Sequence, residues 1–186
     1  MKFTFKRLAA VATIMVLPCS ALAASTVTFQ GEVTDETCNI NINGDTNSIV
    51  LLPTVKASDL AANGAKTGIT PFTITLSDCG GSASGVTSAK TVTTNFLGHS
   101  VIDSAGILGN TETDTAATFV GIQLLETDDA NGTAINLSGV TAAASTISLA
   151  AGDTSGSHTF GAQYYATGTA TAGKVSAMAE YTVSYN

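Results

Sequence analysis

The sequence predicts an all-β protein built as an antiparallel β-sandwich. Segments in which apolar and polar residues alternate recur along the chain, and in a strand this period of two places side chains on opposite faces. Turn-forming Gly, Asn, Asp and Ser residues separate the segments at short intervals. No segment has a long helical period, so two packed antiparallel sheets are the architecture that buries the apolar faces.

The first 23 residues have the features of a secretory signal peptide. A basic start precedes a short apolar run at 8–17, and the pattern Ala21-Leu22-Ala23 is typical of a cleavage site. The apolar run is too short to span a bilayer. We therefore expect residues 1–23 to be removed on export, and residues 24–186 to form one domain of ordinary size.

The mature chain is acidic. Residues 24–186 contain four lysines, no arginine and all fourteen acidic residues, a net charge of −10. Phosphate groups repel such a surface, so nucleic acid and anionic membrane surfaces are poor partners, and no nucleic acid is expected to bind. Charged residues are nevertheless sparse, which suits a surface that is buried against neighbouring molecules.

Two cysteines, Cys38 and Cys79, remain after processing. In an exported chain an even pair most simply forms a disulfide, because thiols oxidise outside the cytoplasm. Zinc would need about four ligands, and only His99 and His158 are available, without paired spacing. Closing this loop is worth on the order of 3 to 4 kcal/mol in the chain-entropy model.

The first strand of the mature chain is expected at 26–33. Its alternation places four residues on one apolar face and leaves polar residues on the other; the apolar set is Val27, Phe29, Gly31 and Val33. A strand at the amino end of the mature chain is free to leave its own domain.

Four elements are expected between the cysteines. Asn39–Asn43 alternates as a strand, and Ile49–Leu52 is a continuous apolar run that predicts a strand buried on both faces. One helical turn is allowed within 56–68. Pro71 opens the alternating strand 72–76, which leads to the second cysteine.

Further strands follow the second cysteine. Gly80–Gly85 is expected to be a loop, Lys90–Leu97 a strand, and Asp103–Ala116 a polar connection. Thr118–Leu125 is expected to be a core strand. The sequence ends with further strands near 147–149, at 159–166 and at 177–185, with a turn at 168–173.

Asn131-Gly132 lies between the apolar stretches 118–125 and 133–137 and predicts a β-hairpin. The alternative for the neighbouring acids Asp128 and Asp129 is a calcium loop. The ligand spacing and terminal Glu of such a loop are missing, so the hairpin is favoured.

Neither the first nor the last strand is protected by charge or proline against pairing with another strand at its edge.

No catalytic constellation is present. The chain has no Gly-x-Ser-x-Gly elbow and no His-Glu-x-x-His motif, and its two histidines lie in polar contexts typical of solvated loops. We therefore expect a protein that is not an enzyme, with no cofactor, no metal and no small-molecule substrate.

The chain resembles the type 1 fimbrial major subunits, the chaperone-usher pilins of Gram-negative bacteria. The residues that carry the resemblance are Val27 to Val33 followed by Cys38, Leu52-Pro53-Thr54-Val55 through Thr70–Ile74 to Cys79, and the closing stretch with Tyr164–Gly168, Gly173 and Tyr185. Each motif is weak alone. Their order and spacing over the whole mature chain make the resemblance specific.

The resemblance implies an incomplete immunoglobulin-like β-sandwich that is completed by a donor strand from a neighbouring subunit. Residues 24–37 would be the donor, with Val27, Phe29, Gly31 and Val33 facing the groove of the next copy. The last strand, with Gly173, Tyr181, Val183 and Tyr185, would form a groove wall and contact a periplasmic chaperone. Related subunits and an outer-membrane usher are the other implied partners, on a route through the periplasm to a fimbrium used in bacterial adhesion.

Two other functions remain open at this point. A minor adaptor or terminator subunit would share the fold, and a terminator would lack a usable groove. A free secreted carbohydrate-binding β-sandwich would be a stable monomer without any added strand. A tip adhesin would need a further receptor-binding domain, for which residues 24–186 have no room.

Overall fold

The computed structural model describes residues 38–46, 48–81, 85–139 and 142–186. Strands make up nearly all of its regular structure, with two short 3-10 turns, η1 (Ala57–Leu60) and η2 (Cys79–Gly81). The strands are β1 (Asn39–Ile42), β2 (Lys66–Ser77), β3 (Lys90–Gly98), β4 (Val101–Ile102), β5 (Ile107–Gly109), β6 (Val120–Leu125), β7 (Ala142–Leu149), β8 (Gly156–Ala166) and β9 (Ala179–Tyr185).

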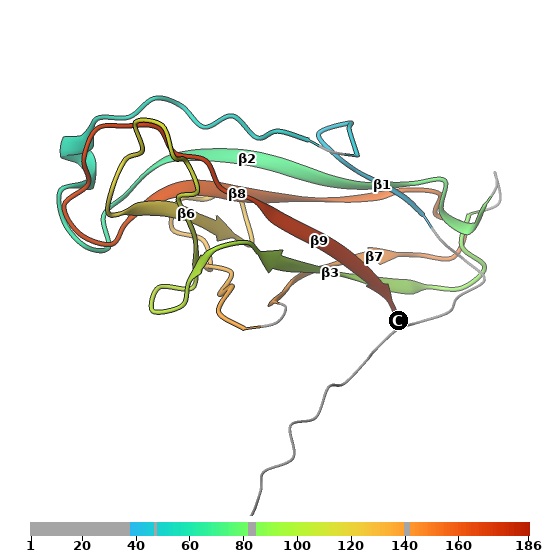
Figure 1. The fold of residues 1–186 in the computed structure, drawn as a ribbon. Helices are drawn as coiled ribbons and strands as arrows, with labels where there is room; N and C mark the ends of the chain where they lie inside the picture. Colours follow the sequence, from blue (N-terminus) through green and yellow to red (C-terminus); the bar gives the residue numbers. More distant parts are fainter. Residues whose placement is uncertain (1–37, 47, 82–84, 140–141) are drawn as a thin grey trace, which may run out of the picture. The chain divides into compact units, whose positions relative to one another are not determined.

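The strands form two antiparallel sheets. The larger has the order β1-β2-β8-β6-β5-β4, and the smaller has the order β7-β3-β9 (Figure 1). Strands β2 and β8 form the centre of the larger sheet, with Phe72 opposite Phe160 and Ile74 opposite His158. In the smaller sheet β3 pairs with β7 on one side and β9 on the other.

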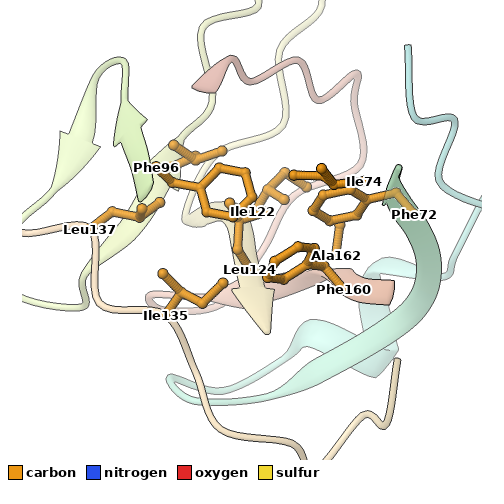
Figure 2. Close-up of a cluster of buried hydrophobic side chains, with 10 residues drawn as sticks. Phe72, Ile74, Phe96, Ile122, Leu124, Ile135, Leu137, Phe160 and Ala162 are labelled. Carbon is orange, nitrogen blue, oxygen red and sulfur yellow. The ribbon is translucent and has the colours of Figure 1, made fainter. Parts of the chain in front are cut away.

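Apolar side chains from both sheets meet in the core (Figure 2). Phe72 and Phe160 stack with ring centroids 5.5 Å apart, and Phe96 of the smaller sheet packs edge-on against Phe160 at 5.2 Å. Contacts of this kind add about 0.5–1.5 kcal/mol each to the gain from burial alone. This aromatic cluster therefore joins the two sheets.

The disulfide joins Cys38, directly before β1, to Cys79, two residues after the end of β2. Cys79 is fully buried in a second apolar cluster with Leu76, Val92, Ile147 and others. The bridge thus fixes the edge strand β1 to β2 at the end of the sheet where their pairing begins, Asn39 opposite Ser77.

The structure confirms most of the expected elements. The strands at 39–43, 71–76, 90–97, 118–125 and 159–166 and the single helical turn are present, some with different ends. The expected hairpin around Asn131-Gly132 is present only in part: Glu126 N–H bonds to Thr133 and Ile135 N–H to Leu124, with an isolated bridge between Leu125 and Ala134, but 133–137 forms no strand. The expected first strand and the signal peptide lie outside the described residues.

Two expectations are wrong. Ile49–Leu52 is not a strand buried on both faces, because it is extended but joins no sheet and leaves Ile49 and Leu51 81% and 83% exposed. The stretch 103–116 is not simply a polar connection, because Ile107–Gly109 forms the buried strand β5. Three residues are too few to show an alternating pattern, so this strand is determined by its pairing with β4 and β6.

Candidate functional site: an open groove beside the last strand

An apolar groove of about 640 Å³ lies between two segments distant in sequence. One rim is the extended segment 48–52, and the other is 175–181, which leads into β9. The floor consists of core side chains from both sheets: Phe72, Phe96, Leu108, Ile122, Leu124, Ala162 and Tyr164. The groove therefore opens directly onto the hydrophobic core.

The backbone of the β9 rim has one paired side and one open side. Thr91 and Asn186 exchange both backbone hydrogen bonds, so even-numbered residues of β9 point their backbone groups at β3. Ser176 and Met178 continue this pattern, since their backbone groups bond to Asn110, Thr111 and His99.

The odd-numbered residues of the same rim point their N–H and C=O groups the other way, towards the groove. For Val175, Ala177, Ala179, Tyr181 and Val183, no backbone partner exists within the described part of the chain. An edge with unpaired groups is a template for another strand.

The opposite rim is also free of strand pairing. Among described residues, none forms a backbone hydrogen bond with 48–53. Val50 and Leu52 pack against the core, whereas the alternate residues Ile49 and Leu51 are exposed. This alternation is that of a strand, so the segment has strand geometry on one side of the space that a further strand would fill.

Exposed apolar side chains mark the groove as a binding site. Ile49, Leu51 and the 56% exposed Met178 lie on its rims, and exposed apolar surface of this kind is characteristic of interaction sites. Water in contact with such a groove is unfavourable, at about 25 cal/mol per Å² of apolar surface. An extended apolar segment would remove that cost and pair both edges.

The predicted groove-wall residues of the last strand lie on β9, with different surroundings. Tyr181 lines the groove and packs against the aromatic cluster. Val183 and Tyr185 pack against the second cluster beside the disulfide, where the Tyr185 hydroxyl accepts a hydrogen bond from Cys38 N–H at 3.0 Å. The predicted residues thus extend from the groove to the disulfide end of the sandwich.

Gly173 lies where the groove rim crosses the loop 115–117. A Cβ at this position would fall against backbone atoms of that loop, among them the Thr115 carbonyl oxygen at 2.6 Å. Glycine permits this close approach, and Lys174 on its carboxyl side bonds to Thr115 and Ala117 through the backbone. Gly173 therefore sets where the rim begins.

Asn110 fastens the same rim and was not identified from sequence. Its Nδ2 group donates to the carbonyl oxygens of Ala117 and Lys174, both at 2.9 Å. Its Oδ1 atom accepts from the N–H groups of Glu112 at 3.0 Å and Ser176 at 2.9 Å. A polar residue in a Gly-rich connection gives no sequence signal for this role, which depends on contacts over more than sixty positions along the chain.

A second cavity of about 530 Å³ adjoins the groove and shares Val175 and Tyr164 with it. It lies between η1, the loop 170–174 and the start of β6, and its lining mixes apolar residues such as Val55 and Leu60 with the charged Glu112 and Lys174. Burial raises the pKa of the Tyr164 hydroxyl. The hollow surface therefore continues past the start of the rim, with a mixed polar and apolar lining.

The described residues contain no cluster of three or more His, Cys, Asp or Glu side chains able to hold a metal ion. None of the described helices has the length and apolarity needed to cross a membrane. The proposed donor residues Val27, Phe29, Gly31 and Val33 lie outside the described residues. What the described part offers is a groove shaped for an extended chain.

Comparison with known proteins gives a consistent assignment. The family model described as "Fimbrial protein" matches residues 27–186. The chain is 41% identical over 160 residues to the F17 fimbrial protein of Escherichia coli, covering 86% of each chain. It is 39% identical over 173 residues to the major fimbrial subunit SMF-1 of Stenotrophomonas maltophilia, covering 91% of this chain and 97% of that one.

Among solved structures, the P pilus rod subunit PapA superposes with a TM-score of 0.57 at 18% identity, covering 80% of this chain and 99% of that one. This likeness supports the incomplete immunoglobulin-like sandwich. The sequence matches extend over most of the chain and link it to structural subunits that assemble with other pilins in a cell-surface fimbrium. The chain belongs to the fimbrial protein family and is a structural pilin subunit of a fimbria.

Proposed function

We propose that the groove receives residues 24–37 of another copy of the chain, so that each subunit completes the sandwich of its neighbour. In this arrangement Val27, Phe29, Gly31 and Val33 face the core, and the polar residues between them face solvent. The donor strand runs antiparallel to β9, because antiparallel pairing is the more stable form and all named strand pairs of the described chain use it.

The observation that carries the proposal is the match between the open edge and the donor. The five groove-facing residues from Val175 to Val183 alternate with paired ones, and 27–33 alternates between apolar and polar with the same period. Gly31 suits a position where the donor backbone comes close to the groove wall, since any side chain there would hold the strands apart.

The proposed contact generates a fibre. The donor strand and the groove are different surfaces, so each subunit donates one strand and accepts another. Such heterologous contacts form an open fibre unless the rotation between successive subunits closes them into a ring. No catalytic group, metal or cofactor takes part in this exchange of strands. Adhesion is then a property of the assembled fimbrium.

An open groove needs protection before assembly. We propose that residues 1–23 direct export, that a periplasmic chaperone pairs with the β9 edge and covers the groove, and that an outer-membrane usher receives the subunit. The exposed rim residues Ile49, Leu51 and Met178 support the need for such a chaperone, because they would promote aggregation of a free subunit.

The open groove favours a polymerising subunit over a terminator. The test is the size and thermal unfolding of the mature protein with and without a synthetic peptide of residues 24–37. We expect the peptide to raise the melting temperature and convert oligomers into monomers, and the same peptide with Gly31→Leu to do neither. A stable monomer that ignores both peptides would refute donor-strand pairing.

A further inference from the structure

One end of the sandwich carries an aromatic side chain in a strained backbone conformation. Phe119, directly before β6, has a φ of +56° and is 60% exposed. A bulky residue with positive φ is a rare outlier, and such strain persists where surrounding structure imposes it, often at functional positions. Here the Phe119 carbonyl oxygen accepts from Thr167 N–H, and the ring lies against Gly168.

Three stretches without charged residues lie together at this end, flanked by the exposed ion pair of Lys174 and Asp114. The stretches 61–65, 115–119 and 167–173 contain only Ala, Thr, Gly, Asn and Phe. They are bonded together: Thr169 Oγ1 donates to the Ala61 carbonyl oxygen at 3.0 Å, and Thr118 N–H donates to Thr171 Oγ1 at 2.9 Å. We call this surface the uncharged end.

The opposite end of the sandwich carries two acidic residues, Asp78 and Asp153, and one basic residue, Lys90, which pairs opposite Leu149. Strand β2 runs from the uncharged end to the disulfide end. Its first residue, Lys66, pairs with Tyr165 beside the uncharged end, and its last, Ser77, pairs with Asn39 beside the disulfide. Asp78 and Asp153 are exposed there. Asp78 precedes Cys79 in the chain, and Asp153 precedes Thr154, whose carbonyl oxygen accepts a hydrogen bond from Cys79 N–H. The two ends of one subunit thus differ in charge, in a mature chain with a net charge of −10.

We propose that the uncharged end, with Phe119 at its centre, is the seat for the body of the subunit that donates its strand. This inference rests on the donor-strand pairing proposed above. In the antiparallel arrangement Val33 of the donor lies near Val175 of the acceptor, where the groove meets the second cavity beside Ala117 and Val120. Only four residues separate Val33 from Cys38, a reach of at most about 18 Å.

This short tether brings the disulfide end of the donor against the uncharged end of the acceptor. Two acidic surfaces held that closely would repel each other, whereas a surface without charge accepts Asp78 and Asp153 of the donor without penalty. An exposed, rigidly held aromatic ring is the kind of side chain that dominates binding energy at such contacts. The strained backbone at Phe119 then presents the ring to the partner.

The test compares donor peptide with whole subunits. The peptide 24–37 lacks the body of the donor subunit, so Phe119→Gly should bind it with an affinity within about twofold of wild type. Assembled Phe119→Gly subunits should dissociate from each other roughly tenfold faster than wild-type subunits. Glycine accepts the positive φ, so the fold is retained. Ser100→Gly is the matched control, because Ser100 is exposed with a φ of +53° outside the uncharged end, and it should assemble as wild type.

A charge introduced into the uncharged end gives an independent result. Ala62→Glu should slow assembly at low salt, and Ala62→Lys should not, since only the former repels the acidic end of the donor. Both variants should bind the peptide as wild type does.

Three outcomes would overturn the inference. One is dissociation of Phe119→Gly subunits at the wild-type rate. Another is an equal loss of peptide and subunit binding, which would assign the residue to the groove or the fold. The third is normal assembly of Phe119→Gly with a failure to form the chaperone complex, which would make the chaperone the occupant of this surface. A wild-type subunit that binds no peptide would instead refute the proposed function itself.

Discussion

Replacing Asn110 should separate the groove rim from the loop that holds it. Asn110→Ala removes four hydrogen bonds, two of them partly buried and two exposed. At roughly 0.5–1.5 kcal/mol per bond, with the exposed ones discounted, the loss is about 2 kcal/mol of unfolding free energy. For a domain of this size that lowers the melting temperature by about 4–8 °C.

Asn110→Asp separates the donor and acceptor roles of the side chain. The introduced carboxylate keeps the bonds from Glu112 and Ser176 but faces the carbonyl oxygens of Ala117 and Lys174. Those oxygens raise the carboxyl pKa in the folded state, because they repel the ionised form. At neutral pH Asn110→Asp should therefore be less stable than Asn110→Ala. Its stability should recover as the pH falls towards about 4, because protonation restores a donor.

Urea unfolding across pH, together with amide exchange of Ser176, measures both effects. We expect Ser176 to lose protection in Asn110→Ala, and binding of the 24–37 peptide to weaken, because the rim is no longer held in place. Ser176→Ala is the control, since its side chain makes none of these bonds. An unchanged unfolding free energy with full Ser176 protection would refute the role given to Asn110.

Three further predictions concern single residues. Thr94 is fully buried and its Oγ1 has no partner among the described residues, so Thr94→Val should raise the unfolding free energy by about 1 kcal/mol; a loss of stability in urea would contradict this. Gly173→Ala should weaken peptide binding, because the added Cβ forces the rim away from the backbone of 115–117, and an affinity equal to wild type would count against that packing. Backbone N–H groups of Asp114 and Thr113 hold the pKa of Glu112 below its ordinary value. The order of this loop should therefore be retained at neutral pH and lost as the pH falls through that lowered pKa, as followed by NMR, and Glu112→Gln should abolish the pH dependence.

Alternating segments predicted the strands well, because each side chain in them reports its own face. Phe72 and Ile74, or Tyr181 and Val183, lie on the core side as their spacing indicates. The run Ile49–Leu52 failed for a physical reason. A continuous apolar sequence indicates burial on both sides, but 48–52 joins no sheet, so Val50 and Leu52 pack on the core while Ile49 and Leu51 remain exposed.

The site was only partly accessible from sequence. The motifs around Gly173 and the last strand indicated a groove wall, and Cys38 and Cys79 indicated the disulfide that the structure contains. The clamp by Asn110 and the positive φ of Phe119 were not foreseen. Both depend on contacts between loops far apart in the chain, and neither residue has a local pattern that favours the conformation it adopts.

The most direct test of donor-strand pairing is amide hydrogen exchange along 175–183, with and without the 24–37 peptide. Even-numbered residues already bond to β3 or to the neighbouring loops, so their protection should change little. The account predicts that Val175, Ala177, Ala179, Tyr181 and Val183 exchange rapidly in the free subunit and become protected when the peptide binds. Binding that leaves these five amides unprotected would contradict strand pairing at the β9 edge.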